Sequence, residues 1–314
     1  MSSKRIVVLG GTGFVGRHLI SRLCAEGHLV TVLSRNLDAH FVRYLPPGSQ
    51  LVTCDVYDGA ALARAFSGTD AVINLVGILN EKGSSGQGFR RAHSELTYIV
   101  VSACRNAGVK RLLQMSALNA GRGQSHYLHT RGEAENVVKA SHLDWTIFQP
   151  SVIFGPDDGL LTRFRELLRL APVLPLARPN AKLAPVYIKD VVEAFVRALD
   201  NPATIRQVYE LYGPEIITLK KLVRRIAQVM GWRRLVLPLP DALGWMQAMI
   251  AEWIPGKPFS RDNFRSLATD SVGGIDGLHR LGITPTPLSA RIDRLLGSAD
   301  SRQKRLDRYR RQTA

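Results

Sequence analysis

A cluster of glycines near the start of the chain is the part of the sequence whose residue types and spacing point most directly to chemistry. Gly11, Gly13 and Gly16 satisfy the spacing G-x-G-x-x-G. The cluster follows the β-branched apolar run 6–9 and precedes apolar residues at helical spacing. In this context glycines let the backbone turn sharply and approach a pyrophosphate, whose charge is met by N–H groups at the helix start.

These residues therefore predict a dinucleotide-phosphate site, with an ordinary glycine-rich turn as the alternative. The predicted contacts are Gly10, Gly11, Thr12, Gly13, Phe14, Val15 and Gly16.

The end of the next predicted strand indicates which dinucleotide is bound. Ser34 and Arg35 stand where an NAD-selective site usually carries a carboxylate that binds the ribose hydroxyls. A guanidinium beside a hydroxyl matches the extra phosphate of NADP(H), which a carboxylate would repel. We therefore predict NADP(H) in preference to NAD(H), with NAD(H) binding and a solvent-exposed loop arginine as alternatives. Asp55 either accepts from the adenine amino group or caps the next helix, and Val56 after it is a further predicted cofactor contact.

The elements that must position these residues alternate in type along the first half of the chain. Apolar segments predict strands at 5–9, 30–33, 51–53, 71–75, 111–115 and 145–148. Amphipathic segments between them predict helices at 14–25, 59–66, 89–106 and about 127–140. This alternation predicts an α/β fold, a Rossmann-type doubly wound parallel sheet with a smaller C-terminal substrate lobe.

The predicted domain organisation rests on a change in the sequence pattern after Pro150. Prolines recur through residues 155–185, which indicates a segment that leaves the sheet rather than another strand–helix unit. Residues 186–188 and a helix at 190–199 are interpreted as a return to the sheet. We predict an NADP(H)-binding Rossmann domain of residues 1–155 and 184–212, a smaller substrate or partner lobe of residues 156–183 and 213–299, and a basic C-terminal tail of residues 300–314.

Composition limits the protein class. The chain has 314 residues, of which 45% are hydrophobic and 22% charged, as in ordinary globular proteins. No apolar stretch is long enough for a membrane span, and the apolar run after Lys4 and Arg5 stops at Gly10, which favours a first strand over an export signal. Three cysteines without metal spacing favour a reducing, cytoplasmic compartment and no metal site.

The net charge of +16 raises the question of an anionic partner. Arginines are scattered, with no aromatic platform or helix-turn-helix pattern, so nucleic acid is disfavoured. Residues 300–314 carry six basic and two acidic residues, which would suit contact with an anionic membrane or an acidic partner protein. The alternative is a solvated helix end. Residues 243–254, LGWMQAMIAEWI, are interpreted as lobe core, with a lipophilic pocket wall or a membrane contact as alternatives.

Four further blocks resemble a known superfamily: residues 74–79 (NLVGIL), 114–120 (QMSALNA), 149–158 (QPSVIFGPDD) and 184–191 (APVYIKDV). They are similar to atypical, extended short-chain dehydrogenases of the NAD-dependent epimerase/dehydratase family. The nearest group is that of the dehydrogenase-like accessory subunit of respiratory complex I and its bacterial relatives. The resemblance implies a Rossmann fold with bound NADPH, and in the mitochondrial relative a structural role. It also implies cofactor contacts at Leu75, Val76, Gly77, Pro150 and Val152.

The resemblance also implies a set of catalytic residues. In active members a Tyr exchanges a proton with the substrate, a Lys four residues later holds the nicotinamide ribose, and a Ser positions the substrate oxygen. The matching residues are Tyr127, Arg131 and Ser116, so this chain has Arg in place of Lys. At about 4 Å and an effective dielectric of about 20, a cation contributes about 4 kcal/mol to holding a phenolate, which Arg can supply. A permanently protonated guanidinium cannot relay a proton.

Two functions remain open on these grounds. The first is an NADP(H)-binding oxidoreductase acting on a bulky, isoprenoid-like or quinone-like carbonyl or alcohol, with Tyr127 and Arg131 also contacting the cofactor. The second is a non-catalytic scaffold or assembly factor stabilised by NADPH and associated with a respiratory complex or membrane surface.

Overall fold

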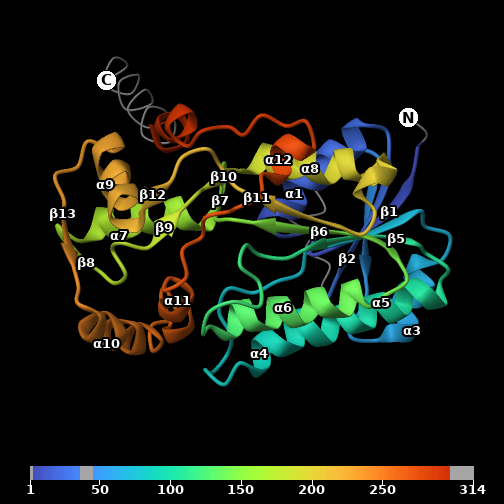
Figure 1. Cartoon of the computed structure of the whole chain (residues 1–314), viewed down its shortest axis with the longest axis horizontal. Coiled ribbons are helices and arrows are strands. Elements are labelled where there is room, and N and C mark those ends of the chain that lie inside the picture. Colours follow the sequence, from blue (N-terminus) through green and yellow to red (C-terminus); the bar gives the residue numbers. More distant parts are fainter. Residues whose placement is uncertain (1–2, 36–44, 298–314) are drawn as a thin grey trace, which may run out of the picture.

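A parallel sheet of seven strands organises the protein in a computed structural model that describes residues 3–35 and 45–297. The strand order is β11-β6-β5-β4-β1-β2-β3, and each neighbouring pair runs parallel (Figure 1). The strand order reverses between β1 and β4. The strand bounds are β1 (Arg5–Leu9), β2 (Leu29–Ser34), β3 (Ser49–Thr53), β4 (Ala71–Asn74), β5 (Arg111–Met115), β6 (Asp144–Pro150) and β11 (Gln207–Leu211).

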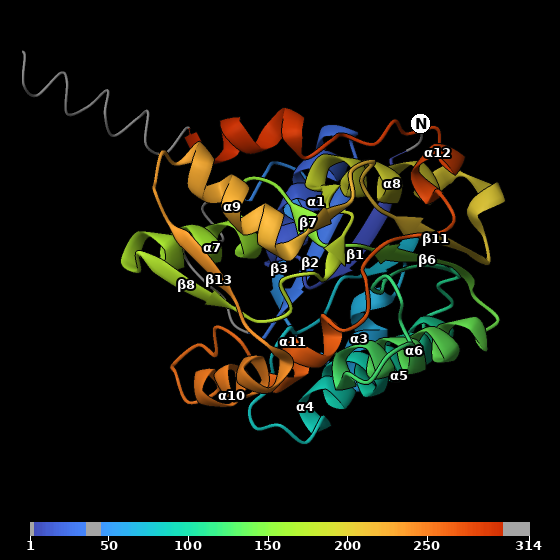
Figure 2. The same cartoon turned by 60° about the vertical axis from the view of Figure 1, so that its left-hand side comes forward.

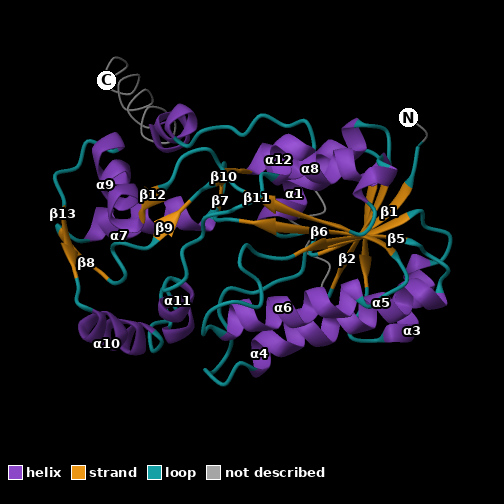
Figure 3. Ribbon diagram, in the orientation of Figure 1, coloured by secondary structure: helices purple, strands orange, loops and turns teal. Residues whose placement is uncertain are grey.

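Helices cover both faces of this sheet (Figure 3). Along β1, Ile6 and Val8 join one core cluster while Val7 and Leu9 join the other, as the alternation of side chains along a strand requires. The helices α1 (Phe14–Ala25) and α8 (Ile188–Asp200) lie on the first face. On the second lie α3 (Gly59–Phe66), α5 (Leu96–Asn106) and α6 (His126–Lys139). The predicted doubly wound parallel fold is confirmed.

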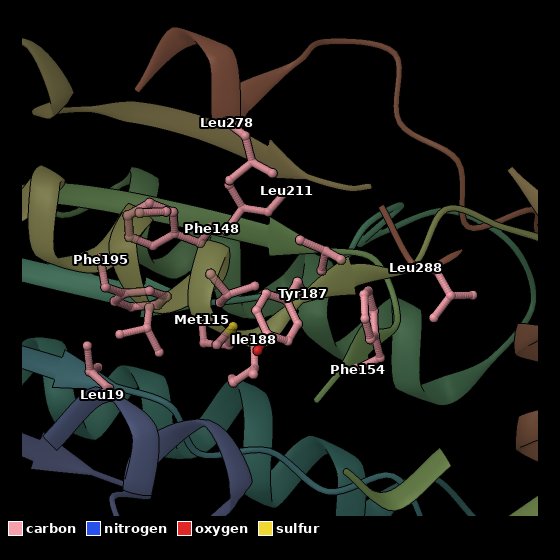
Figure 4. Close-up of a cluster of buried hydrophobic side chains, with 14 of the residues drawn as sticks. Leu19, Met115, Phe148, Phe154, Tyr187, Ile188, Phe195, Leu211, Leu278 and Leu288 are labelled. Atoms are coloured by element: carbon pink, nitrogen blue, oxygen red, sulfur yellow. The ribbon is translucent and has the colours of Figure 1, made fainter. Parts of the chain in front are cut away.

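Aromatic packing joins α8 to the sheet. The rings of Phe195 on α8 and Phe148 on β6 have centroids 4.2 Å apart, and both side chains are buried (Figure 4). The same cluster continues through Phe154 and Tyr187, whose centroids are 5.4 Å apart, toward the smaller lobe. The apolar core is therefore continuous from the sheet into that lobe.

Most of the remaining elements gather beyond the ends of the strands (Figures 1 and 2). Three two-stranded pairs connect them: β10 (Val186–Tyr187) with β7 (Ile153–Phe154), β12 (Ile217–Thr218) with β9 (Lys182–Leu183), and β13 (Leu235–Pro238) with β8 (Val173–Leu176). The helices there are α7 (Gly159–Leu170), α9 (Leu219–Val229), α10 (Asp241–Ala251) and α11 (Arg261–Ser266), whereas α12 (Gly277–Arg280) packs against β11 of the main sheet. No helix of the described chain is long and apolar enough to cross a bilayer. The predicted domain boundaries stay a prediction.

Two predicted elements differ from the structure. The segment 186–188 does not return to the main sheet, because α8 begins at Ile188 and leaves only the two residues of β10 to pair with β7. The seventh strand is β11, which pairs with β6. The predicted helix 89–106 is three consecutive helical segments: α4 (Gln87–Arg90), a π-helix (Arg91–Glu95) and α5.

The interpretation of residues 243–254 as lobe core is wrong for most of the large side chains. In α10 the buried residues are small, Gly244, Ala248 and Ala251. A Cβ at Gly244 would come within 2.9 Å of the Phe264 ring, so only small residues fit on this side of the helix. The other large apolar residues of the segment point outward and are exposed, whereas Trp245 is half-buried and its ring packs against Phe264, with centroids 5.6 Å apart.

Candidate functional site

The glycine turn, residues 9–16, connects β1 to α1 at the carboxyl edge of the sheet. Gly10 adopts a φ of +75°, and a Cβ there would lie 3.0 Å from the carbonyl carbon of Leu75 and from the amide nitrogen of Val76. A Cβ at Gly16 would lie 2.4 Å from the carbonyl oxygen of Gly11. The turn therefore packs against the end of β4 at the point where the strand order reverses, which is where ligands bind in such sheets.

The start of α1 is open to an anion. Gly13 is the N-cap residue and offers no side-chain hydrogen bond, and the first turn carries no acidic residue. Its own N–H donates to the carbonyl oxygen of Gly10 at 3.1 Å, which shapes the turn. The remaining first-turn N–H groups and the positive end of the helix dipole suit a phosphate.

The residues predicted to select the cofactor lie at the ends of β2 and β3. Arg35 follows β2 and is exposed. The backbone N–H of Cys54 donates to the carbonyl oxygen of Ser34 at 2.9 Å, so the ends of these two strands lie side by side. Asp55 is exposed and accepts from the N–H of Tyr57 at 3.0 Å.

The helix-cap alternative for Asp55 is wrong, because Asp58 caps α3 through the N–H groups of Ala60 and Ala61. Asp55 lies three positions before that cap, and its carboxylate closes a local turn instead. Val56, beside it, is buried. The adenine contact predicted for Asp55 stays a prediction.

Tyr127 and Arg131 lie one turn apart on α6. The Arg131 guanidinium carbon is 5.6 Å from the centroid of the Tyr127 ring. The ring also packs edge-on against Phe89 and His93, at centroid distances of 6.2 Å and 5.5 Å. Tyr127 is half-buried, so its ring is held while its edge reaches solvent.

Arg131 is buried at the ends of β4 and β5. Its Nη1 donates to the carbonyl oxygens of Val76 at 3.2 Å and Met115 at 3.0 Å. Its Nε is buried and has no hydrogen-bond partner in the part of the chain that the structure describes. A Cβ on residue 77 would lie 1.7 Å from Nη2, so Gly77 is required for the guanidinium to occupy this place.

Ser116 is directed toward another partner. Its hydroxyl donates to Glu135 Oε1 at 2.6 Å, and Gln149 Nε2 donates to the same oxygen at 2.6 Å. Lys139 Nζ lies 2.9 Å from the other carboxylate oxygen. No hydrogen bond joins Ser116 to Tyr127 within residues 3–35 and 45–297, so the structure brings Tyr127 and Arg131 together and leaves Ser116 in a separate network.

The remaining predicted contacts lie at the same edge. Leu75, Val76 and Gly77 follow β4 directly. Pro150 ends β6, and Val152 accepts from the N–H of Val186. Because the carboxyl ends of parallel strands meet at one edge, these residues flank the glycine turn.

Sequence reasoning missed His93, which lies in the π-helix. The N–H of Ile78 donates to His93 Nε2 at 3.2 Å, and Nδ1 lies 2.9 Å from Thr130 Oγ1. Burial, reinforced by the positive charge of Arg131, lowers the pKa of His93 to about 2, so the ring is neutral. Its only sequence signal would have been a histidine on the apolar side of a predicted helix, which also fits an ordinary core residue.

It also missed Asp262, which reaches α6 from the smaller lobe. Its two carboxylate oxygens accept from the N–H groups of His126 at 2.7 Å and Tyr127 at 3.1 Å. Burial raises the pKa of Asp262, although these hydrogen bonds favour its charged form. More than a hundred residues separate the partners in sequence, and no local pattern could have paired them.

The site fits a dinucleotide on two observations of its own geometry. Gly10 and Gly16 keep the turn free of side chains where a phosphate would approach. Arg131 offers an unpartnered Nε and an Nη2 without a hydrogen bond to the described residues, close to where the nicotinamide end of a dinucleotide would lie. The residues that would hold the phosphates and the nicotinamide ribose are thus present.

Comparison with known proteins agrees with this geometry. The family model described as NAD(P)H-binding matches residues 10–166. The chain belongs to this NAD(P)H-binding family. Its epimerase/dehydratase-like short-chain dehydrogenase character, expected from the sequence blocks, is confirmed.

Two relatives show the range of this family. The chain is 28% identical over 292 residues to mitochondrial NADH dehydrogenase (ubiquinone) 1 alpha subcomplex subunit 9 of Rattus norvegicus, covering 90% of this chain and 76% of the relative. It is 27% identical over 237 residues to ceramide reductase of Caulobacter vibrioides, covering 75% and 74%. A solved dTDP-glucose 4,6-dehydratase of Streptomyces venezuelae with NAD bound shares the fold, with a TM-score of 0.73, 20% identity and coverage of 93% and 95%.

Proposed function

We propose that this NAD(P)H-binding protein is an NADP(H)-dependent reductase that interconverts a carbonyl and an alcohol in a bulky, lipophilic, isoprenoid-like or quinone-like substrate. The observation that carries the proposal is the placement of Tyr127 and Arg131 beside the glycine turn, where the strand order reverses. A proton donor and a fixed cation there are what carbonyl reduction requires.

The residues of the chain divide the work between them. When bound, the dinucleotide supplies or accepts a hydride. Tyr127 donates the proton that the substrate oxygen needs as a carbonyl becomes an alcohol. Arg131 stabilises the phenolate that remains, and its buried position strengthens that interaction. Asp262 fixes the start of α6 and thereby the position of Tyr127.

Arg35 supports the preference for NADP(H). It is an exposed guanidinium at the end of β2 beside a serine, which suits the extra phosphate on the ribose. Arg35 occupies the position at which an NAD-selective site usually carries a carboxylate. NAD(H) remains the alternative cofactor.

A lipophilic substrate is supported by relatives whose names refer to ceramide and ubiquinone. We propose a cytoplasmic location at the surface of the inner membrane. The basic tail, residues 300–314, lies outside the described residues, and its contact with a membrane or respiratory complex stays part of the proposal.

The second candidate is a non-catalytic scaffold or assembly factor stabilised by NADPH. The arrangement around Ser116 favours it, since the hydroxyl donates to Glu135 instead of facing Tyr127. The Nη1 of Arg131 likewise donates to two backbone carbonyl oxygens within the protein. A cofactor held by such a site would stabilise the fold without turnover.

One experiment separates the two candidates. NADPH oxidation is measured with a panel of long-chain ketones and quinones for the wild type, for Tyr127→Phe and for Tyr98→Phe, an exposed tyrosine on α5 that serves as the control. The reductase proposal predicts turnover that Tyr127→Phe abolishes and Tyr98→Phe keeps. Tight NADPH binding without turnover in the wild type supports the scaffold instead.

A further inference from the structure

The outer face of α10 and of the turn that follows it carries several large apolar side chains that are exposed. Trp253 is 88% exposed and Ile250 is 59% exposed. Four more large apolar side chains, between 42% and 50% exposed, complete what we call the α10 face: Leu243, Met246, Met249 and Ile254. At about 100° per residue the four positions within α10, Leu243, Met246, Met249 and Ile250, fall within about 120° of the helix circumference and form one stripe. Trp253 and Ile254 follow in the turn after the helix.

The packing of α10 explains why this stripe faces outward. The helix approaches Ala177 and Phe264 through Gly244, whose Cβ would lie within 3.0 Å of both. Ala248 and Ala251 extend this buried side. The opposite side, which carries the large residues, contacts no other element of the described chain that would bury it.

Neighbouring strands extend the apolar surface. β13 leads directly into α10, and Gln247 Nε2 donates to the carbonyl oxygen of Pro175 on β8 at 2.9 Å. Val173 on β8 and Leu235 on β13 are paired in register, and both are exposed. Figures 1 and 2 place α10 and the β8–β13 pair at the same end of the molecule.

The charges around this surface favour an anionic occupant. The acids at its two ends are neutralised, Asp241 by Arg178 at 2.7 Å and Glu252 by Arg261 at 2.9 Å. Two exposed arginines without an ion pair to the described residues, Arg169 and Arg233, precede the starts of β8 and β13, at the strand end of this surface. The whole chain carries a net charge of +16. An apolar stripe with tryptophan and methionine, bordered by cations, matches the interface of an anionic bilayer.

We infer that the α10 face docks in the plane of an anionic lipid bilayer, with Trp253 and Ile250 inserted among the lipids. The bilayer is favoured over a second copy of this chain because the surrounding positive charge of two copies would repel. The inference is independent of turnover at Tyr127, so an inactive protein would still bind membranes.

Vesicle sedimentation with the full chain tests this inference. Vesicles of phosphatidylcholine with phosphatidylglycerol are compared with vesicles of phosphatidylcholine alone. The double variant Ile250→Glu/Trp253→Glu is compared with Leu29→Glu/Ile275→Glu, which places equal charge on exposed apolar residues away from α10. We expect the α10 variant to lose about tenfold or more in partitioning onto anionic vesicles, and the control variant to keep wild-type partitioning.

Tryptophan emission gives a second readout that the basic tail cannot imitate. Emission of the wild type should shift to the blue on anionic vesicles, and Trp253→Phe should remove that shift. Equal sedimentation of the α10 variant and the wild type, with no shift from Trp253, would overturn the inference. A dimer of the wild type in solution that the α10 variant lacks, without vesicle binding, would overturn it in favour of a self-interface.

Discussion

The glycine turn and the Tyr127 region lie at the same edge of one sheet, yet they are built differently. The turn is made of backbone and glycines, and it keeps side chains away from the place of a phosphate. The Tyr127 region is made of buried polar side chains that already have partners within the protein, such as Arg131 and Ser116. Cofactor binding therefore depends on the shape of the backbone turn. Turnover depends instead on side-chain groups, most of which already form hydrogen bonds within the protein.

The largest expected effect comes from filling the glycine turn. A Cβ in Gly16→Ala would overlap the carbonyl oxygen of Gly11, so the turn must open and misplace the N–H groups of α1. We expect NADPH affinity, measured by calorimetry, to fall about a hundredfold, or about 2.7 kcal/mol. Gly159→Ala, at a position where a Cβ meets nothing within 4 Å, serves as the control. Unchanged affinity in Gly16→Ala would break the contrast between the two regions.

In the Tyr127 region, the buried His93 should make the free energy of unfolding depend on pH. Because the pKa of His93 is lowered to about 2, the folded protein excludes a proton that the unfolded chain binds below its usual value of 6.5. The stability from neutral His93 is therefore complete above that value and is lost as pH falls. Between pH 7 and pH 5 the free energy of unfolding should drop by about 2 kcal/mol on this account.

Denaturation of His93→Gln at both pH values checks this expectation, since the variant should lose most of that dependence. His142→Gln, an exposed histidine, should behave like the wild type. Identical pH dependence in His93→Gln would contradict a buried, neutral His93.

A smaller effect tests whether a glycine is needed at position 77 because the Arg131 guanidinium occupies the space of a Cβ there. Gly77→Ala should displace the guanidinium, because its Cβ would lie 1.7 Å from Nη2, and destabilise the protein by about 1–3 kcal/mol. In an Arg131→Ala background the same change should cost less, with a coupling of about 1–2 kcal/mol. Additive effects in this double-mutant cycle would show that the two residues do not depend on each other.

The smallest effect sharpens the cofactor choice of the first region. In Arg35→Asp, a carboxylate would repel the ribose phosphate, so NADPH affinity should fall about tenfold more than NADH affinity, or about 1.4 kcal/mol. Titration of both dinucleotides into wild type and variant measures the difference. Equal losses for the two dinucleotides would remove the reason for preferring NADP(H).

How well the sequence predicts each region depends on how far apart in the chain its interacting residues lie. Strand β1, the glycine turn and α1 lie within one short segment, so apolar periodicity and glycine spacing were enough to predict them. Arg131 could be found from its spacing to Tyr127, but its hydrogen bonds to Val76 and Met115 depend on how the sheet is assembled.

Other features depend on contacts that sequence does not show. Asp262 caps α6 from the far lobe, and β11 rather than β10 completes the sheet because of where α8 begins. The segment 243–254 was predicted to be core because it is apolar nearly all round. Its small residues Gly244 and Ala248 pack inward beside the half-buried Trp245, and most of its large apolar residues are exposed.

Isotope transfer is the most direct test of the proposed reductase. The wild type is mixed with NADPH carrying deuterium at the transferable position and with the long-chain ketone or quinone panel, and the products are analysed by mass spectrometry. The account predicts deuterium in the alcohol product, and its disappearance in Tyr127→Phe. NADPH bound at one equivalent with all the deuterium retained on the dinucleotide would contradict it.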